Sequence, residues 1–429
     1  MERIFTRDLA RRVGERVRIA GWIQQRRLLG RVTFVVLRDG TGLAQVVVED
    51  ERLAAELAEL PPETVVEVEG DVRPMSRAPG GLELHVPSIN VLATPAQAPP
   101  VELRRPVLKE QLPTLLDYAP VALRHPRERA KFRLAAASVR GFRSALDAHG
   151  FTEIQTPKIV AAATEGGANV FPVDYFGRRA YLAQSPQFYK QTMVGVFERV
   201  YETGPVFRAE PHDTARHLAE YVSLDAEVGF VEDHFMVMRF ARDAVAGMAA
   251  GVRESESEAV ELLGVELPEV TEEIPVVDFT AALDMLGHEG TATSDLAPAD
   301  ERRIGEWARR EHGSDFVFVA GFPMSKRPFY THPDPARPGY SNSFDLIFRG
   351  LELITGGQRL HRYGDYLAAL AERGLEPEPF EGYLQAFRFG MPPHGGFAIG
   401  LERWLSRLIG AANIRETTLF PRDLKRLTP

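Results

Sequence analysis

Oxygen atoms are the metal ligands that this sequence can offer. The chain has no cysteine, and its eleven histidines form neither an HExxH nor an HxH pattern. Thiolate sites are therefore excluded, and a zinc site is not expected. Any metal would therefore be a hard cation held by oxygen ligands, such as carboxylates, hydroxyls and backbone carbonyls.

Two carboxylates lie on one face of a predicted strand. Apolar residues alternate with polar or small ones through YVSLDAEVGF (221–230), as in an antiparallel strand with one buried face. Asp225 and Glu227 both fall on the polar side of this strand. The pattern allows two interpretations, in which the acids either support a functional site or belong to a solvated face.

Nucleotide chemistry would need an unusual arrangement here. The chain contains neither a GxxxxGK[ST] loop nor a strand–GxGxxG–helix unit, so both common phosphate cradles are missing. The segment GGFAIGLERWLSRLIG (395–410) predicts a glycine-rich strand that continues into a helix with an apolar stripe. Arg403 lies off that stripe, so burial does not explain it.

The first hundred residues predict a small β-barrel. Short β-branched runs bounded by glycine turns indicate strands at 16–23, 31–38, 43–48, 64–73 and 82–92, with a helix at 51–60. This order suits a five-stranded OB barrel over residues 1–95, although the pattern also allows an SH3-like barrel. OB barrels commonly bind single-stranded nucleic acid by stacking bases on aromatic side chains.

Charge is distributed unevenly along the chain. The net charge of −9, from 51 basic and 60 acidic residues, does not by itself favour a nucleic-acid partner. Residues 1–38 nevertheless carry ten arginines and three acids. This segment is either a contact for a phosphate backbone or a solvated arginine-rich surface.

The remainder of the chain predicts a linker and an α+β domain. Seven prolines between 93 and 127 indicate a linker, assigned to 96–127, that packs along a surface. A second domain is assigned to 128–429, with a helix at 128–148 and one long strand at 343–354. The more polar region at about 251–315 is predicted to be an insertion.

Membrane association is not expected. No apolar run approaches the roughly 18–20 residues that a membrane helix needs. The first residues, MERIFTRDLARR, lack the apolar stretch of a secretory signal. A cytoplasmic location without a membrane partner is therefore predicted.

Three segments resemble the signature motifs of class II aminoacyl-tRNA synthetases. GFTEIQTPKIV (150–160) resembles motif 1, PVFRAEPHDTARHLAEY (205–221) motif 2, and GGFAIGLERWL (395–405) motif 3. Between them, TEGGANVF (164–171), AQSPQFYKQ (183–191) and FRGLELITGGQRLH (348–361) look like the aspartyl enzymes of the archaeal and eukaryotic-like type. The resemblance covers nearly the whole chain. It implies an α+β fold, with an N-terminal five-stranded OB β-barrel and a class II catalytic domain built on an antiparallel sheet flanked by helices.

The implied reaction is activation of L-aspartate with ATP, followed by transfer to tRNA. The substrate carboxylate attacks the α-phosphorus of ATP and pyrophosphate leaves, so no general base is required. Positioning and neutralisation of phosphate charge carry the catalysis. Arginines and a Mg²⁺ cofactor are therefore expected, rather than a catalytic histidine or serine.

Arg208, Arg403 and Glu352 are the catalytic residues that the resemblance implies. Arg208 would hold the α-phosphate and the substrate carboxylate, although an arginine in a structural ion pair is the alternative. Arg403 would grip the γ-phosphate, and Glu352 with Thr355 would ligate Mg²⁺. The implied ATP contacts are Arg208, Ala209, Glu210, Arg216, His217, Leu218, Glu352, Gly400, Leu401, Glu402 and Arg403, with His217 stacked on adenine.

The implied amino-acid pocket is centred on Arg359. Its guanidinium suits a bidentate grip on the side-chain carboxylate of aspartate. Glu165 would bind the substrate ammonium on a loop whose glycines allow closure. The implied aspartate-binding residues are Glu165, Gln187, Phe188, Tyr189, Lys190, Arg208, Thr355 and Arg359.

Three barrel residues match positions that contact the tRNA anticodon, namely Phe34, Gln45 and Arg27. Phe34 would stack on a base, but alternation along RVTFVVLR also fits a phenylalanine in the barrel core. Arg26 and Arg27 are either phosphate contacts or plain surface charges.

One departure from the family concerns the choice of tRNA. Gln24 and Ser88, beside Pro87, stand where enzymes restricted to the aspartate tRNA carry tryptophan and lysine. This departure predicts a non-discriminating enzyme that charges tRNA(Asp) and also tRNA(Asn). The second product would feed an amidotransferase.

Three alternatives stay open at this point. An asparaginyl-tRNA synthetase is disfavoured by the GGQR segment (356–359), and a tRNA-independent asparagine synthetase-like enzyme of the same catalytic fold lacks an anticodon barrel. A non-catalytic tRNA-binding paralogue should have lost Arg208, Glu352 or Arg403. Because motif 1 forms a dimer interface in this class, a homodimer is expected.

Overall fold

The computed structural model describes residues 1–161, 169–288 and 295–428. The chain divides into two compact units, Met1–Glu128 and Arg129–Pro429. No helix in the described part of the chain is long and apolar enough to cross a membrane.

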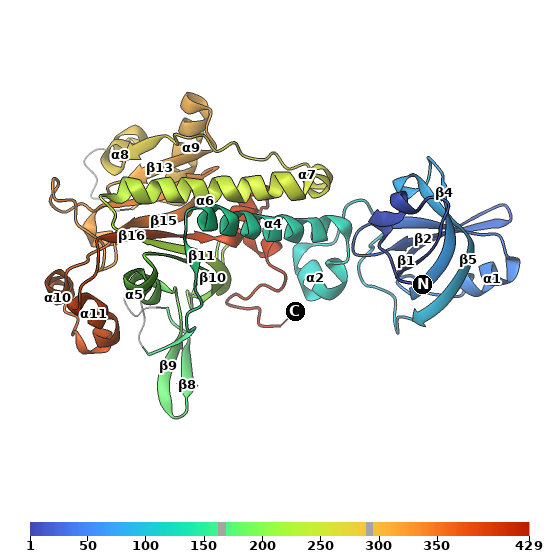
Figure 1. Cartoon of the computed structure of the whole chain (residues 1–429), viewed down its shortest axis with the longest axis horizontal. Coiled ribbons are helices and arrows are strands. Elements are labelled where there is room, and N and C mark those ends of the chain that lie inside the picture. Colours follow the sequence, from blue (N-terminus) through green and yellow to red (C-terminus); the bar gives the residue numbers. More distant parts are fainter. Residues whose placement is uncertain (162–168, 289–294, 429) are drawn as a thin grey trace. The chain divides into compact units, whose positions relative to one another are not determined.

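A closed barrel with the strand order β1-β2-β3-β5-β4 forms the first unit (Figure 1). Its elements are η1 Thr6–Arg12, β1 Arg16–Leu29, β2 Val32–Arg38, β3 Leu43–Val48, α1 Glu51–Ala58, β4 Val65–Pro74, η2 Pro79–Gly81 and β5 Leu82–Ala93. The predicted order of strands and helix is confirmed, except that β1 continues six residues beyond its predicted end, to Leu29.

Valine-rich alternation fills the barrel with apolar side chains. Val35 and Leu37 of β2 belong to this core, whereas Phe34, directly before Val35, does not. Arg38 is the exception on the inward side, since it is 1 % exposed and donates to Glu63 at 2.6 Å. The N-terminal arginines are therefore not all part of one solvated surface.

The proline-rich segment after the barrel contains two short helices, α2 Leu112–Asp117 and α3 Ala119–Ala122. Both begin with a proline in their first turn, where the missing N–H costs nothing. Val101 and Leu103 pack with Ala122 in a small apolar cluster. This packing gives residues 96–127 more local structure than the predicted linker.

The second unit is built on a sheet in the order β12-β13-β14-β15-β16-β11-β10-β6, with a separate small sheet β7-β9-β8. The strands are β6 Thr152–Glu153, β7 Ile159–Val160, β8 Pro172–Tyr175, β9 Arg178–Leu182, β10 Arg199–Phe207, β11 Glu220–Gly229, β12 Val276–Asp278, β13 Phe316–Ala320, β14 Ser343–Phe348, β15 Leu351–Gln358 and β16 His394–Gly400. The interior pairs are antiparallel as predicted, but the edge pairs β12–β13 and β10–β6 are parallel.

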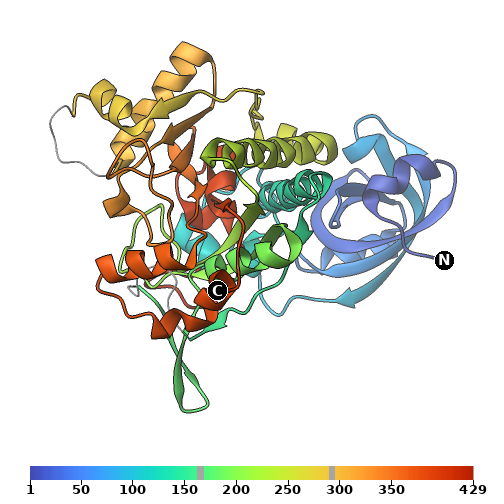
Figure 2. The same ribbon diagram turned by 60° about the vertical axis from the view of Figure 1, so that its left-hand side comes forward.

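Helices flank this sheet (Figures 1 and 2). They are α4 Pro126–Ala148, α5 Gln187–Phe197, α6 His234–Ser255, α7 Ser257–Leu263, α8 Phe279–Leu286, α9 Pro298–His312, α10 Tyr363–Glu372, α11 Glu381–Arg388 and α12 Leu401–Leu408, with short turns η3 Met324–Lys326, η4 Glu378–Phe380 and η5 Ile414–Thr417. Both views show α4 and α6 side by side. A Cβ on Gly141 of α4 would collide with the Gly247 carbonyl of α6, so glycine permits this approach.

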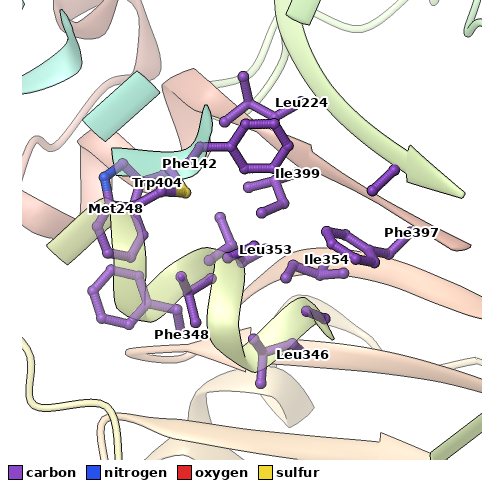
Figure 3. Close-up of a cluster of buried hydrophobic side chains, with 14 of the residues drawn as sticks. Phe142, Leu224, Met248, Leu346, Phe348, Leu353, Ile354, Phe397, Ile399 and Trp404 are labelled. Carbon is purple, nitrogen blue, oxygen red and sulfur yellow. The ribbon is translucent and has the colours of Figure 1, made fainter. Parts of the chain in front are cut away.

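The main core lies between these helices and one face of the sheet (Figure 3). Phe142 of α4, Met248 of α6 and Trp404 of α12 meet Leu224 and Ile399 from the strands. Burying large side chains from three helices on one face of the sheet stabilises the sheet and makes it rigid. On the opposite face the central strands carry polar side chains, whereas Val317, Val319 and Ile347 of β13 and β14 pack in a second apolar cluster.

The segment 343–354 is a hairpin rather than the one long strand predicted from its apolar pattern. Arg349 and Gly350 both have positive φ, at 47° and 73°, and form the turn between β14 and β15. A turn with two positive φ values matches the twist of antiparallel strands. The Arg-Gly pair was the overlooked turn signal.

Candidate active site

The central strands line up side chains in a row across the polar face of the sheet. Backbone pairing joins Asp345 to Thr355, Thr355 to Ala398, and Ala398 to Asp225. Paired residues point to the same face, and neighbouring positions along each strand point to the other. The apolar core on one face therefore fixes the positions of these polar groups on the other.

A strongly charged cavity opens on this face. Among the described residues, its lining contains seven cations, Lys190, Arg208, Arg216, Lys326, Arg327, Arg359 and Arg403, and four acids, Glu210, Asp225, Glu352 and Glu402. The excess of positive charge raises the local concentration of anions. The cavity therefore favours a small molecule that carries phosphate or carboxylate groups.

Two buried cations and two buried acids form a network at the cavity floor. Lys190 Nζ lies 3.0 Å from Asp225 Oδ1 and 3.3 Å from Glu227 Oε2. Arg359 Nε donates to Glu227 Oε1 at 2.9 Å. Although burial acts to raise the pKa of Glu227, Arg359 and Lys190 hold it below the ordinary value. The solvated-face interpretation of Asp225 and Glu227 is therefore wrong, since both are almost fully buried.

Glycine makes room for this network. A Cβ on Gly396 would collide with the Glu227 carboxylate and with the carbonyl of Ala226. The Gly396 carbonyl also accepts from Arg359 Nη2 at 2.9 Å. The GG pair of motif 3 therefore lets a buried acid stand directly against the arginine.

A neutral histidine supports the floor from behind. His394 is fully buried, with Nδ1 2.9 Å from the Pro392 carbonyl and Nε2 3.0 Å from Gln191 Nε2. Because a carbonyl can only accept, Nδ1 carries the proton and Nε2 accepts from Gln191. Burial lowers the pKa of His394 to about 4, against the opposing charge of Glu227. The ring thus adds no third positive charge beside Lys190 and Arg359.

The loop between β10 and β11 supplies the next group of predicted residues. Arg208 Nη1 lies 3.8 Å from Glu210 Oε1, and Glu210 Oε2 lies 3.7 Å from His217 Nε2. Burial lowers the pKa of His217 although Glu210 opposes this. Arg415 holds the outer part of the loop, since its Nη2 lies 2.7 Å from Asp213 Oδ1. The loop therefore presents an ordered set of charged side chains to the cavity.

The strand-to-helix turn of motif 3 positions Arg403. Helix α12 begins at Leu401 directly after Gly400, and Arg403 Nη1 donates to Glu352 Oε1 at 3.0 Å. The adjacent Glu402 also lines the cavity, and both of its oxygens accept from the backbone N–H of Val222 at 3.1 Å. Burial raises the pKa of Glu402 to about 7.

Oxygen donors gather around Glu352. The Thr355 hydroxyl lies 3.3 Å from Glu352 Oε1, and Asp345 pairs with Thr355 across the sheet. Burial and the charge of Glu352 raise the pKa of Asp345 to about 7, although Arg327 opposes this at 3.0 Å. A divalent cation would relieve the repulsion between the two acids. These donors fit Mg²⁺, which usually takes one or two carboxylates and keeps several waters. The described residues contain no group of three or more acids, histidines or cysteines that could hold a metal alone.

The cavity brings most of the predicted substrate residues together. They are Gln187, Lys190, Arg208, Glu210, Arg216, His217, Leu218, Glu352, Thr355, Arg359, Gly400, Glu402 and Arg403. Gln187 is 5 % exposed, and its Nε2 has no hydrogen-bond partner among the described residues. Because buried donors are normally satisfied, a ligand acceptor is the natural partner for this amide.

Four predicted residues do not line the cavity, namely Phe188, Tyr189, Ala209 and Leu401. Gln187 and Lys190 share one face of α5, so helical spacing turns Phe188 and Tyr189 elsewhere. Phe188 stacks on Tyr383 with 4.3 Å between ring centroids. Ala209 offers only its backbone, which donates to the Asn169 carbonyl at 2.8 Å, and Leu401 packs against the main core. Glu165 lies outside the described residues.

Several residues of the site were not predicted from the sequence. Lys326 at the end of the turn η3 and Arg327 directly after it line the cavity, and Asp345 adds a second acid beside Glu352. Glu301 of α9 contacts Arg216 from the segment that was predicted to be an insertion. Only the charged SKR sequence at 325–327 gave a local signal, because the other two acids depend on strand pairing and tertiary packing.

The predicted anticodon residues lie on the outside of the barrel. Phe34 is partly exposed and pairs with Arg27 of β1 and Val47 of β3. The barrel-core alternative for Phe34 is therefore wrong. Gln45 lies on the same face and donates to Glu83 Oε1 at 2.6 Å. Arg26 differs from Arg27, since its guanidinium donates to the Leu57 carbonyl instead of facing solvent.

The residues predicted to select the tRNA are not adjacent. Gln24 sits at the bulge of β1, partly buried, and its Oε1 has no partner among the described residues. Ser88 is exposed and Pro87 partly exposed on β5. Ser88 pairs with Glu69, which pairs with Arg18, so it stands six residues away from Gln24 along β1.

Comparison with protein families identifies the family of each of the two units. A family model described as "tRNA synthetases class II (D, K and N)" matches residues 111–424, and one described as "OB-fold nucleic acid binding domain" matches 17–92. The chain belongs to the class II tRNA synthetases. The second match removes the SH3-like alternative for the barrel of this synthetase.

Individual relatives cover the synthetase from end to end. It is 46 % identical over 429 residues to an aspartate–tRNA(Asp/Asn) ligase of Thermus thermophilus, with 100 % of both chains covered. It is 40 % identical to an aspartate–tRNA(Asp) ligase of Pyrococcus furiosus, with 97 % of each covered. Its fold matches asparaginyl-tRNA synthetase from Pyrococcus horikoshii complexed with asparaginyl-adenylate, with a TM-score of 0.92, 31 % identity and 100 % of both chains covered. Enzymes for aspartate and for asparagine are therefore both similar to this chain, and the fold by itself does not identify the amino acid.

Proposed function

We propose that this synthetase activates L-aspartate with ATP and transfers it to tRNA(Asp). One observation carries the proposal: Lys190 and Arg359 form the floor of the cavity that Arg208 and Arg403 also line. A carboxylate side chain and a polyphosphate can therefore be neutralised in one enclosed space.

The floor favours aspartate over asparagine because of what it presents to a ligand. Lys190, Arg359 and the unpaired Gln187 Nε2 are donors that line the cavity. Glu227 stands behind the cations and is not part of the lining. Asp225 lines it, but its oxygens already lie near Lys190 Nζ and the Ser223 hydroxyl. An asparagine amide would need an acceptor here, whereas a second carboxylate oxygen would meet donors.

ATP would occupy the opposite part of the cavity. Arg208 lies near Glu210 and over Tyr221, at 5.9 Å, so its guanidinium has charged and aromatic neighbours at the mouth of the site. Glu352, Thr355 and Asp345 would hold Mg²⁺, which when bound neutralises phosphate charge and helps pyrophosphate to leave. The chain's arginines orient the α-phosphate against the attacking carboxylate, so the side chains move no proton in this step.

We propose further that the enzyme also charges tRNA(Asn). The proposal rests on Gln24 and Ser88 in place of tryptophan and lysine, and on the Asp/Asn names of relatives such as that of Thermus thermophilus. The aspartyl product on tRNA(Asn) would feed an amidotransferase. A cytoplasmic homodimer that uses motif 1 as its interface completes the proposal.

Aspartate-dependent exchange of pyrophosphate into ATP tests the activation step directly. Parallel reactions with asparagine separate the main alternative, which the shared fold with asparaginyl enzymes keeps relevant. We expect exchange with aspartate and Mg²⁺, and little with asparagine. Preferred exchange with asparagine would overturn the proposal.

Charging of tRNA(Asp) and tRNA(Asn) transcripts, side by side, tests the range of tRNA. Equal or similar charging of both supports the non-discriminating enzyme. Strict preference for tRNA(Asp) refutes that part and leaves aspartate activation standing.

A further inference from the structure

Glu301 joins three separate parts of the catalytic unit through one carboxylate oxygen. Its Oε2 accepts from Arg216 Nη2 at 2.7 Å and from the backbone N–H of Glu352 at 2.9 Å. Glu301 belongs to the first turn of α9, Arg216 to the loop before β11, and Glu352 to β15. One acid from the 251–315 segment therefore connects the predicted ATP loop to the predicted metal ligand.

The position of Glu301 is that of a support and not of a ligand contact. Glu301 is 7 % exposed and is not among the residues that line the cavity, whereas Arg216 and Glu352 are. Figure 1 shows α9 beside β13 at the margin of the sheet. The carboxylate thus reaches its two partners from behind the site.

Arg216 has a particular need for this partner. It faces a cavity that already holds Arg208, Arg403 and four other cations among the described residues. Repulsion from these charges acts to push a loop guanidinium outward, since charges at short range interact strongly where water is scarce. The hydrogen bond to a nearly buried carboxylate opposes that repulsion and fixes the guanidinium geometry.

We propose that Glu301 is a positioning residue for ATP. It holds the Arg216 guanidinium at the polyphosphate and fixes the backbone at Glu352 relative to Arg216. The inference rests on the proposed function, because it assumes that ATP occupies the Arg208–Arg403 part of the cavity. It gives the 251–315 segment a part in catalysis: α9 is placed so that its first turn completes the ATP site from outside.

Two substitutions separate the charge of Glu301 from its hydrogen bonds. Glu301→Gln keeps an oxygen acceptor for the Glu352 N–H but loses the charge that holds Arg216. Glu301→Ala removes both. In pyrophosphate exchange, we expect the KM for ATP to rise about tenfold in Glu301→Gln, since a charge-assisted bond is lost, and further in Glu301→Ala. The KM for aspartate should change less than twofold, as the Lys190–Arg359 floor is not touched.

The matched control is Glu306→Gln, the same substitution at an exposed position of the same helix. It should leave both KM values unchanged. Arg216→Ala, alone and combined with Glu301→Gln, gives a double-mutant cycle. If Glu301 acts through Arg216, the combined rise in the KM for ATP is clearly smaller than the product of the single effects.

General loss of structure predicts different results. A merely structural Glu301 would lower kcat and raise both KM values together, and its effects would multiply with those of Arg216→Ala. Either outcome overturns the inference. Calorimetric titration of each variant with Mg·ATP, in the absence of amino acid, measures the same support without catalysis. If the wild-type enzyme binds ATP but shows no aspartate-dependent exchange, the proposed function fails while the role of Glu301 stays open to this direct measurement.

Discussion

The cavity floor and the outer face of the barrel use polar side chains in opposite ways. On the floor, Lys190 and Arg359 are at most 7 % exposed, and each has an acid within 3.0 Å. On the barrel face, Phe34 is partly exposed and Arg27 is exposed, and Arg27 donates to Gln25, two residues away, at 2.9 Å. The first surface is fixed before a ligand arrives, whereas the second is open.

This difference follows the size and nature of the proposed ligands. A small amino acid can contribute only a few contacts, so the enzyme must supply charges that are already oriented. An RNA loop brings its own charge and its own stacking surface, and a partly exposed aromatic ring is sufficient to receive a base. Substitutions on the floor should therefore abolish function, and those on the barrel should attenuate it.

Arg359→Leu tests the floor and should have the largest effect. The change removes the partner of Glu227 and leaves a buried carboxylate beside the amino-acid site. A loss of about 2–5 kcal/mol in transition-state stabilisation is expected, which reduces aspartate-dependent exchange to a trace. Exchange assays with saturating ATP provide the measurement, with Arg362→Leu at a nearby exposed position as control. Near-normal exchange in Arg359→Leu would break the comparison at its strongest point.

The buried carboxylate of Glu402, which also lines the cavity, should make the stability of the enzyme depend on pH. Burial raises its pKa to about 7 in the folded enzyme, from an ordinary value of 4.5. The folded state therefore binds the proton more tightly than the unfolded state, so stability declines as pH rises from about 4.5 to 7. Between pH 5 and 8 this amounts to about 2–3 kcal/mol.

Glu402→Gln isolates that contribution, because the amide stays neutral and keeps an oxygen acceptor for the Val222 N–H. Urea unfolding of both proteins at several pH values gives the difference in unfolding free energy. We expect the wild type to lose stability relative to the variant as pH rises, with most of the change complete by pH 8. A constant difference across this range would show that the buried carboxylate does not titrate as its surroundings indicate.

The sequence alone could predict those strands that have one buried face and one polar face. Alternation of β-branched residues located every barrel strand and β11, because a face packed on a core imposes a period of two. The pattern failed at 343–354, where both strands of the hairpin are largely buried and rich in apolar residues. Only the Arg349–Gly350 pair separates them, and this short turn signal does not interrupt the apolar pattern.

Site residues were predictable where the motif itself carries them. Arg208, Glu352, Arg359 and Arg403 were located by their motifs and meet in one cavity. The partners that orient them were not located. Glu227 was left between two interpretations, since its burial depends on the room that Gly396 provides from another strand. Glu301 reaches the site only through the packing of α9, and no local pattern marks such a contact.

Phe34→Ala tests the open surface and should have a moderate effect. Loss of one stacking partner for a base costs about 1–3 kcal/mol, or roughly tenfold in kcat/KM for tRNA charging. Pyrophosphate exchange does not require tRNA, so it should be unchanged. Phe34→Trp keeps a ring at the position and should preserve charging. If Phe34→Ala also reduced exchange, the barrel face would not be independent of the catalytic cavity.

The smallest expected effect concerns the choice between tRNAs. Gln24→Trp and Ser88→Lys restore the residue types of enzymes restricted to the aspartate tRNA, and each should raise the preference for tRNA(Asp) by a few-fold. Gln24 Oε1 has no partner among the described residues, and Ser88 is exposed, so neither change removes a side-chain hydrogen bond recorded among the described residues of the barrel. The ratio of kcat/KM values for the two transcripts measures the preference, with exchange as control. Six positions along β1 correspond to roughly 20 Å, so the two effects should multiply. A combined effect far from the product would mean that both side chains act through one element of the bound RNA. The barrel face would then be organised by the RNA, whereas the cavity floor is organised before its ligand binds.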